Sequence, residues 1–175
     1  MRLFVFAFSL FFGLHLMAQD LPVDSASGKV IYEEIFDAPG SADELYTRAL
    51  QWFDDFYPNA RVVIEEKEPE KHKITAKHKF NLQIEDKKGR NQNVGFIIYD
   101  FKVWQKDNKV RYKIDEIHLE YKVYYGIEQW MDPKHEDADN NPAKLREIDA
   151  YFQTLIASLK EGMQPEEEPV DEDDW

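Results

Sequence analysis

Polar and apolar side chains alternate regularly in the middle of the chain. From residue 72 to residue 84, even positions are apolar except for His72 and His78, while odd positions are polar and include three lysines. Because successive side chains of a strand point to opposite faces, this pattern predicts an antiparallel strand with one buried face. Runs of β-branched and aromatic residues predict four more strands, at 29–36, 61–66, 94–106 and 109–125.

Two of these strands also indicate where they lie in the sheet. The strand at 94–106 is apolar at both odd and even positions, which predicts a central place in the sheet. The strand at 109–125 has apolar residues at even positions up to Ile114 and at odd positions from Ile117 onward. This change of parity predicts a β-bulge near residues 115 and 116.

Two further segments have apolar residues every three or four positions, which predicts helices. The first begins at a capping box formed by Ser41 and Glu44. The second begins with Asn141 as its N-cap and ends with Gly162 just beyond its C-cap. The apolar stripes are Leu45, Ala49, Trp52, Phe53 and Phe56 in the first helix and Leu145, Ile148, Phe152, Leu155, Ile156 and Leu159 in the second.

The predicted order of elements is therefore β-α-β-β-β-β-α. One antiparallel sheet and two helices with a single apolar face each pack most simply with both helices on one face of the sheet. We predict a single two-layer α+β domain over residues 28–163.

The N-terminal segment differs in composition from the rest of the chain. Arg2 is followed by an apolar run and then by Ala18, which predicts a cleaved signal peptide at residues 1–18. The alternative is an uncleaved membrane anchor, but the run is shorter than the roughly 20 apolar residues that span a bilayer. We therefore expect cleavage and no membrane insertion after it. Residues 19–27 are predicted to form a short leader. We expect a soluble exported protein, periplasmic or extracellular.

The C-terminal segment carries much of the charge. The whole chain has a net charge of −13 and no cysteine. Residues 164–175 contain seven acidic residues and two prolines, which predicts a disordered acidic tail. Without Arg2 and these seven acids the net charge is −7. The absence of cysteine excludes disulfides, zinc–thiolate sites and thiol nucleophiles. Separately, we expect the protein to be a monomer.

The chain resembles a known family in several segments: GKVIYEEIF, SADELYTRALQWF, VRYKIDEIHLEY and the closing LIASLKEGM. The family consists of exported bacterial proteins that carry a domain of unknown function with a TATA-binding-protein-like fold. The similarity covers roughly residues 28–163. It implies a β-α-β4-α fold with a curved antiparallel sheet, and it implies no activity, cofactor, substrate or DNA binding.

A local basic patch raises the possibility of a nucleic-acid partner. It consists of Lys73, Lys77, Lys79, Lys87, Lys88 and Arg90. The domain as a whole is acidic, which opposes the phosphate attraction on which nucleic-acid affinity depends. We therefore expect a solvated strand face and no nucleic-acid partner. An acidic protein or polysaccharide is the alternative occupant.

The loop at 126–140 offers several oxygen and imidazole groups but fails as a metal site. Its sequence from Asp137 resembles the opening of a calcium loop, yet Pro142 replaces the required glycine and Ile148 the bidentate glutamate. His72 and His78 lie about 20 Å apart along an extended strand and cannot bind one ion together. We predict no metal and no cofactor.

Two histidines are candidates for catalysis. His78 lies on the apolar face of its strand, and His118 lies on the polar parity of another. A small hydrolase or isomerase that uses either histidine with a neighbouring carboxylate is one hypothesis. No nucleophile elbow or phosphate loop accompanies them, so a hydrogen-bonded histidine at the edge of the core is the alternative interpretation.

A group of aromatic residues follows the last strand and suggests ligand binding. Tyr121, Tyr124, Tyr125 and Trp130, together with His78, are our candidates for the lining of a pocket between sheet and helix. The alternative is that these rings simply fill the core. Our leading hypothesis is a non-enzymatic binding or interaction module for a small apolar ligand or a protein partner.

Overall fold

The computed structural model describes residues 21–86 and 89–165. Its elements are β1 (Tyr32–Asp37), α1 (Ala42–Phe56), α2 (Ala60–Val63), β2 (Ile64–Glu68), the 3-10 turn η1 (Pro69–Lys71), β3 (Lys73–Glu85), β4 (Asn91–Lys106), β5 (Lys109–Leu119), β6 (Tyr125–Gly126), the 3-10 turn η2 (Ile127–Met131) and α3 (Asn141–Gly162). The predicted signal peptide and all but the first two residues of the predicted tail lie outside the described residues.

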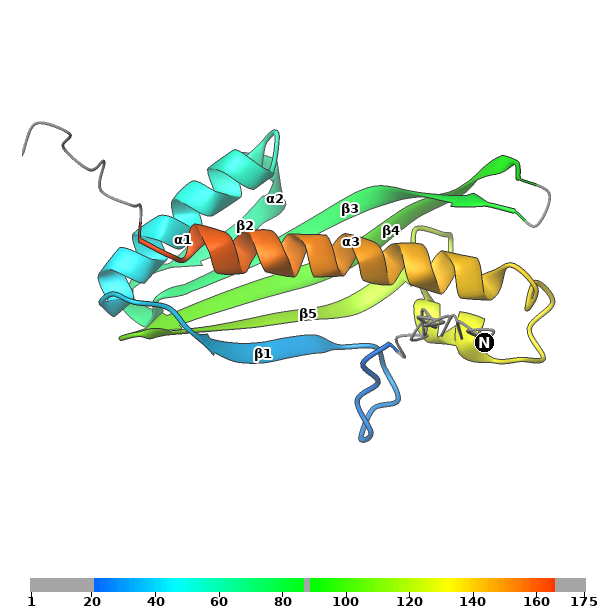
Figure 1. Ribbon diagram of the computed structural model, residues 1–175, viewed down its shortest axis with the longest axis horizontal. Coiled ribbons are helices and arrows are strands. Elements are labelled where there is room, and N and C mark those ends of the chain that lie inside the picture. The colour runs from blue at the N-terminus through cyan, green and yellow to red at the C-terminus, as the bar shows by residue number, and fades with distance from the viewer. Residues whose placement is uncertain (1–20, 87–88, 166–175) are drawn as a thin grey trace, which may run out of the picture.

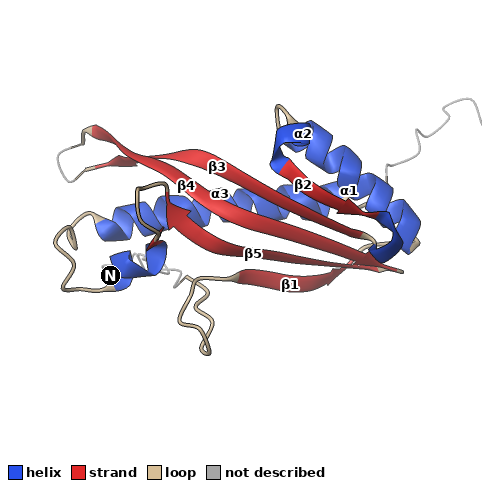
Figure 2. Cartoon of the chain, turned by 180° about the vertical axis from the view of Figure 1, so that it is seen from behind, coloured by secondary structure: helices blue, strands red, loops and turns tan. Residues whose placement is uncertain are grey.

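The fold has two layers (Figure 1). The strands form one antiparallel sheet in the order β1-β5-β4-β3-β2, and the short β6 pairs with β5. Both α1 and α3 lie on one face of this sheet, and the view from behind shows the strands in front of the helices (Figure 2). The predicted fold class, the helices on one face and the central position of the fourth predicted strand are confirmed.

The core lies between the two helices and the sheet. The capping box at the start of α1 is present, with the Ser41 side chain accepting from the Glu44 amide. From α1, Leu45, Ala49 and Phe53 are fully buried. From α3, the buried stripe is Ile148, Phe152, Leu155, Ile156 and Leu159, as its spacing predicts.

The predicted β-bulge is present in β5. Between the pairs of Ile98 with His118 and Asp100 with Asp115, β5 has one more residue than β4. Glu116 is the residue that adopts a left-handed conformation, with a φ of 51°. As a result, Ile114 and Ile117 both point into the core although their positions have opposite parity.

Two strand predictions are wrong in part. The segment predicted as a strand at 61–66 begins as the helical turn α2, because Ala60 and Val63 at i and i+3 both pack into the core. The last predicted strand stops at Leu119 instead of residue 125, and residues 120–124 form a loop. That loop continues the apolar alternation in sequence, but its side chains lie in solvent.

The ends of several elements also differ from the sequence prediction. The first strand begins at Tyr32 instead of residue 29, and Asn140, not Asn141, is the N-cap residue of α3. Of the predicted leader, residues 21–27 form a turn closed by a bridge between Val23 and Val30, and Leu21 is 8% exposed in the core.

Gly162 was predicted to follow the C-cap of the last helix, but it is the final residue of α3 itself. A Cβ at this position would lie 2.6 Å from Cδ1 of Trp52. The Trp52 ring cannot move away easily, because it packs against Phe56 at 4.9 Å and Phe101 at 5.8 Å between ring centroids. The glycine is therefore required by close packing of α3 on α1.

We predict that Gly162→Ala lowers the free energy of unfolding by about 1–3 kcal/mol, the usual cost of overpacking a core. Helix propensity alone would give the opposite sign, because alanine is better than glycine in a helix by about 1 kcal/mol. Urea denaturation of the variant, with the exposed Glu161→Ala as control, measures the difference. A stabilised Gly162→Ala protein would contradict the packing described here.

Candidate functional site

The face of the sheet that points away from the helices carries several ion pairs between neighbouring strands. Lys77 on β3 lies 2.9 Å from Asp100 on β4, and Asp115 on β5 pairs with both Lys102 at 2.9 Å and Lys113 at 3.4 Å. Lys102 and Lys113 are direct cross-strand neighbours, so Asp115 offsets the repulsion between two like charges. We call these five residues the ion-pair array.

The predicted basic patch is paired in the same way wherever the structure describes it. The pairs are Lys73 with Glu68, Lys77 with Asp100, Lys79 with Glu120 and Arg90 with Asp86. Lys87 and Lys88 lie outside the described residues. Exposed pairs of this kind contribute about 0–1 kcal/mol each, so their main effect is to balance charge across the face.

One end of this outer face is apolar instead of ionic. Large apolar side chains are exposed at this end, namely Phe96 (41% exposed) on β4 and Tyr121 (71%), Val123 (70%) and Tyr124 (51%) in the loop that follows β5. The amide of Glu120 donates to the carbonyl of Phe96 at 2.8 Å, which holds the start of the 120–124 loop beside β4. We call these four residues the aromatic surface. Large exposed apolar side chains grouped in one place are typical of interaction sites.

The β-bulge in β5 provides the support for this surface. Because the bulge shifts the parity of β5, His118 points to the outer face, next to Ile98 in register. The Tyr124 ring packs on the His118 ring with centroids 4.8 Å apart, and its hydroxyl donates to Glu116 at 3.3 Å. Tyr124 is thus fixed on its inner side and open to solvent on the other.

Two lysines border the aromatic surface. Lys79 lies 4.7 Å from the centroid of the Phe96 ring and binds Glu120. Lys29 lies 5.6 Å from the Tyr124 ring and binds Glu116 at 2.8 Å. The hydrogen bond from Lys29 holds the pKa of the Glu116 carboxyl below its usual range. The rim is therefore polar and electrically balanced.

The structure separates the residues predicted to line a pocket. Tyr121 and Tyr124 belong to the aromatic surface. Tyr125 is half-buried and its hydroxyl bonds to the His135 ring, while Trp130 is buried with the Lys144 ammonium 4.9 Å from its ring centroid. Trp130 is therefore part of the packed core. Sequence reasoning missed Phe96 and Val123, although Phe96 has the outward parity beside the buried Ile97.

His78 lies in a different part of the fold, within a group of tyrosine hydroxyls. Its Nδ1 is 3.4 Å from the hydroxyl of Tyr99, which also bonds to Tyr57 at 3.1 Å and Tyr151 at 3.0 Å. Burial raises the pKa of all three tyrosines, so they remain protonated near neutral pH. Among the described residues His78 makes no hydrogen bond to a carboxylate.

His118 differs from His78 in its environment. Its Nδ1 donates to the backbone carbonyl of Glu116 at 2.5 Å, which leaves Nε2 as the acceptor nitrogen. Within the part of the chain that the structure describes, no serine, threonine or carboxylate side chain forms a hydrogen bond with this ring. Among the described residues, neither of the two histidines predicted as alternative catalytic bases is bonded to a carboxylate, serine or threonine side chain, and His78 is bonded only to a tyrosine hydroxyl.

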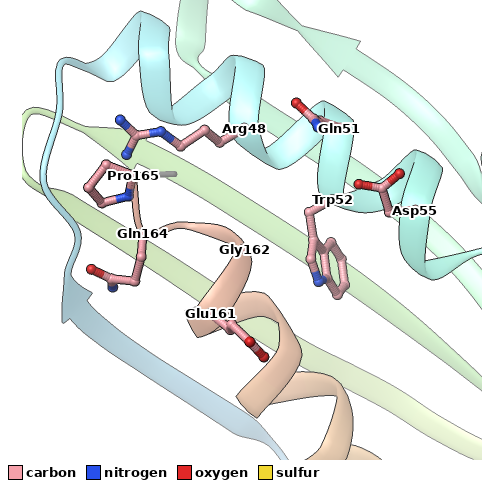
Figure 3. A pocket seen from close by; sticks show the side chains of 8 residues that line it. All are labelled: Arg48, Gln51, Trp52, Asp55, Glu161, Gly162, Gln164 and Pro165. Atoms are coloured by element: carbon pink, nitrogen blue, oxygen red, sulfur yellow. The ribbon is translucent and has the colours of Figure 1, made fainter. Parts of the chain in front are cut away.

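A separate cavity of about 530 Å³ lies where α1 meets the end of α3 (Figure 3). Arg48 and Trp52 form part of its wall, and both are tied to α3: Arg48 donates to the carbonyl of Met163 at 3.0 Å, and Trp52 to the Ser158 hydroxyl at 3.0 Å. The remaining lining residues are Gln51, Asp55, Glu161, Gly162, Gln164 and Pro165. None of the residues predicted to line a pocket contributes to it.

The loop considered as a calcium mimic is held by its own side chains. Asp137 accepts from Asn140 at 2.9 Å and pairs with Lys144, which keeps the pKa of its carboxyl below the usual range. Over residues 21–86 and 89–165, no three acidic or histidine side chains are grouped to bind a metal ion. No helix in the same ranges has both the length and the hydropathy needed to cross a membrane.

Comparison with known proteins identifies a family and a fold. The family described as a domain of unknown function (DUF4468) with TBP-like fold matches residues 21–120. A crystal structure of a DUF4468 family protein from Bacteroides ovatus superimposes with a TM-score of 0.65 at 18% identity, covering 88% of this chain and 95% of that one. A TBP-like protein from Parabacteroides distasonis gives 0.64 at 16% identity, with coverage of 81% and 96%. Among curated proteins, none matches the chain.

The buried position of His78 leads to a prediction about pH. Burial lowers the pKa of its ring in the folded state, so the unfolded chain binds the proton more readily. The contribution of His78 to stability is therefore present above the ordinary histidine pKa of about 6.5 and is lost as the pH falls through and below that value.

We predict that His78→Gln removes this component and flattens the dependence of unfolding free energy on pH between about pH 5 and pH 7. Urea denaturation at several pH values in that range gives the change of unfolding free energy with pH. This slope, and not the absolute stability, is compared between the wild type and the variant. His78→Phe, which also lacks a titrating group, should flatten the slope equally. An unchanged slope in both variants would show that His78 titrates alike in the folded and unfolded chains.

Proposed function

The chain belongs to the DUF4468 family of domains of unknown function with a TBP-like fold, and on this premise we propose that it is an exported, non-enzymatic interaction module. Its binding site is the aromatic surface, and its partner is a protein. Export is supported by the layout of residues 1–18, with one charge, an apolar run and a small residue before the polar Gln19.

The observation that carries this proposal is the contrast between the two parts of the outer face. Across the middle strands of that face the charges are matched within the ion-pair array. At one end, the side chains of Phe96, Tyr121 and Tyr124 are 41%, 71% and 51% exposed. Tyrosine is enriched at the centre of protein interfaces because it offers a large rigid ring and a hydroxyl for hydrogen bonding.

The chemistry of the surface also restricts the partner. The bordering lysines, Lys29 and Lys79, are already engaged by Glu116 and Glu120, so these two lysines offer little free positive charge for phosphates. This supports a protein partner over a nucleic acid. The complementary surface should be apolar at its centre, with a hydrogen-bond acceptor placed for the Tyr121 hydroxyl and a donor for the Tyr124 hydroxyl, whose own proton goes to Glu116.

A hydrolase or isomerase that uses His78 or His118 has less support. Each of these reactions needs a base within hydrogen-bond reach of a nucleophile, an acid or a substrate proton. His78 faces tyrosine hydroxyls that remain protonated, and the ring of His118 is covered on one side by Tyr124. Exposure of the Tyr124 ring is expected if the ring contacts a partner, whereas catalysis by His118 does not require it.

The proposed export gives a prediction for the protein in its native cell. We expect the protein in the exported fraction to have lost residues 1–18, with Gln19 at its N-terminus, because Ala18 is the small residue at the end of the apolar run. Cell fractionation followed by intact mass measurement tests this. A full-length mass in the cytosol would exclude export.

The proposed binding site is tested with Tyr121→Ser and Tyr124→Ser. Both side chains are more than half exposed, so the fold should be preserved while each truncation weakens partner capture by about tenfold, the effect of losing roughly 1.4 kcal/mol at an interface centre. The matched control is Ile35→Ser, an equally exposed apolar residue on β1. Affinity capture from the exported fraction, with quantitative mass spectrometry, measures the loss.

The comparison between these variants decides the outcome. A protein captured by the wild type and by Ile35→Ser, but lost with both tyrosine variants, would support the aromatic surface as the binding site. Equal capture by all four proteins would contradict it. Circular dichroism melting curves of the variants establish that each is folded.

A further inference from the structure

Among the described residues, no other strand covers a long stretch of the edge of β3. Its neighbour β2 pairs only with residues from Lys73 to Ala76, whereas β3 continues to Glu85. The remaining stretch, Lys77 to Glu85, pairs with β4 on one side only. The view from behind shows this part of β3 running beyond β2 along the border of the sheet (Figure 2). We call this stretch the open edge.

The hydrogen bonds of the ladder show which backbone groups face outward. The amide of Gln105 donates to the carbonyl of His72, so the backbone of His72 faces β4. In an antiparallel strand the backbone groups of alternate residues point to alternate sides. Odd-numbered residues from Lys77 to Glu85 therefore direct both N–H and C=O to the open edge. Their side chains are exposed as well.

We propose that the open edges of two copies of this chain pair with each other, antiparallel, about a two-fold axis at Asn81. In this register Lys77 lies opposite Glu85 of the second copy, and Lys79 lies opposite Gln83. Each outward N–H and C=O from Lys77 to Glu85 then meets a complementary group. The two sheets become one continuous sheet through both copies.

The charge pattern of the open edge favours a second copy as the occupant. Lysine stands at one end of the edge and glutamate at the other, on the same face, so a two-fold axis brings Glu85 of each copy beside Lys77 of the other, where Lys77 is shared with Asp100. At the opposite border of the sheet, β1 has the sequence YEEIFD, with three acidic residues and no basic residue. Two copies of β1 would place acids against acids, which disfavours pairing there.

This pairing removes an exposed edge that would otherwise invite unspecific association. It is independent of the proposed function, because the aromatic surface consists of residues from β4 and the 120–124 loop and stays open when β3 is covered. The sequence led us to expect a monomer, and the open edge now favours a dimer.

Single cysteines test the register directly, because the chain has no cysteine of its own. In the proposed dimer, Asn81 of one copy lies opposite Asn81 of the other. Their Cα atoms are about 5.5 Å apart, a separation that a disulfide can bridge. Asn81→Cys should therefore form a covalent dimer under mild oxidation, whereas Thr154→Cys, equally exposed on α3, should not. Equal crosslinking of both variants, or none, would overturn the proposal.

Charge reversal tests the proposed contact between Lys77 of one copy and Glu85 of the other. Sedimentation of the protein without residues 1–18 should show a dimer, and Lys77→Glu and Glu85→Lys should each weaken dimerisation by about tenfold. The double variant should restore it. A wild-type protein that remains a single chain up to millimolar concentration would overturn the proposal, as would a dimer that ignores both substitutions. Melting curves of the variants identify any that fail to fold.

Discussion

Coverage of the sheet on one face only is the constraint from which the other features of this protein follow. α1 and α3 supply apolar stripes to the same face, so every inward side chain of β3, β4 and β5 can be buried in one core. Within residues 21–86 and 89–165 no second layer covers the opposite face, which must therefore be stable in water by itself. Its strands meet this requirement with matched charges, in which Asp115 joins two neighbouring lysines. The aromatic surface, where these charged pairs give way to exposed apolar side chains, is therefore the part of the face that we propose as a binding site.

The β-bulge of β5 connects the core to the outer surface. By inserting Glu116 in a left-handed conformation, it lets Ile117 remain in the core while His118 turns outward. Without the extra residue, His118 would enter the core and Ile117 would face solvent. The same residue supplies the carboxylate that binds Lys29 and the Tyr124 hydroxyl. One local irregularity thus holds the N-terminal segment, the strand and the exposed ring together.

Much of the fold could be predicted from local patterns, and the exceptions have clear physical causes. The alternation around Ile74 to Ile84, the capping box at Ser41 and the parity change near Glu116 each report backbone geometry within a few residues. The exposure of Tyr121 and the close approach of Gly162 to Trp52 depend on packing between distant segments. Likewise, the basic patch appeared unmatched in sequence because its partners, among them Asp100 and Glu120, lie on other strands or beyond them. The open edge is a property of strand order, which no local pattern contains.

The central claim is that the outer face carries no covering layer and that its aromatic end is free to bind. Paramagnetic relaxation by a soluble, uncharged probe, measured by NMR on the protein without residues 1–18, tests this directly. The account predicts strong relaxation of the Phe96, Tyr121 and Tyr124 rings and little relaxation of the buried Phe101 and Phe152 rings. Protection of Phe96 and Tyr124 to the level of Phe101 would contradict it, since another part of the chain or a second copy would then cover the face.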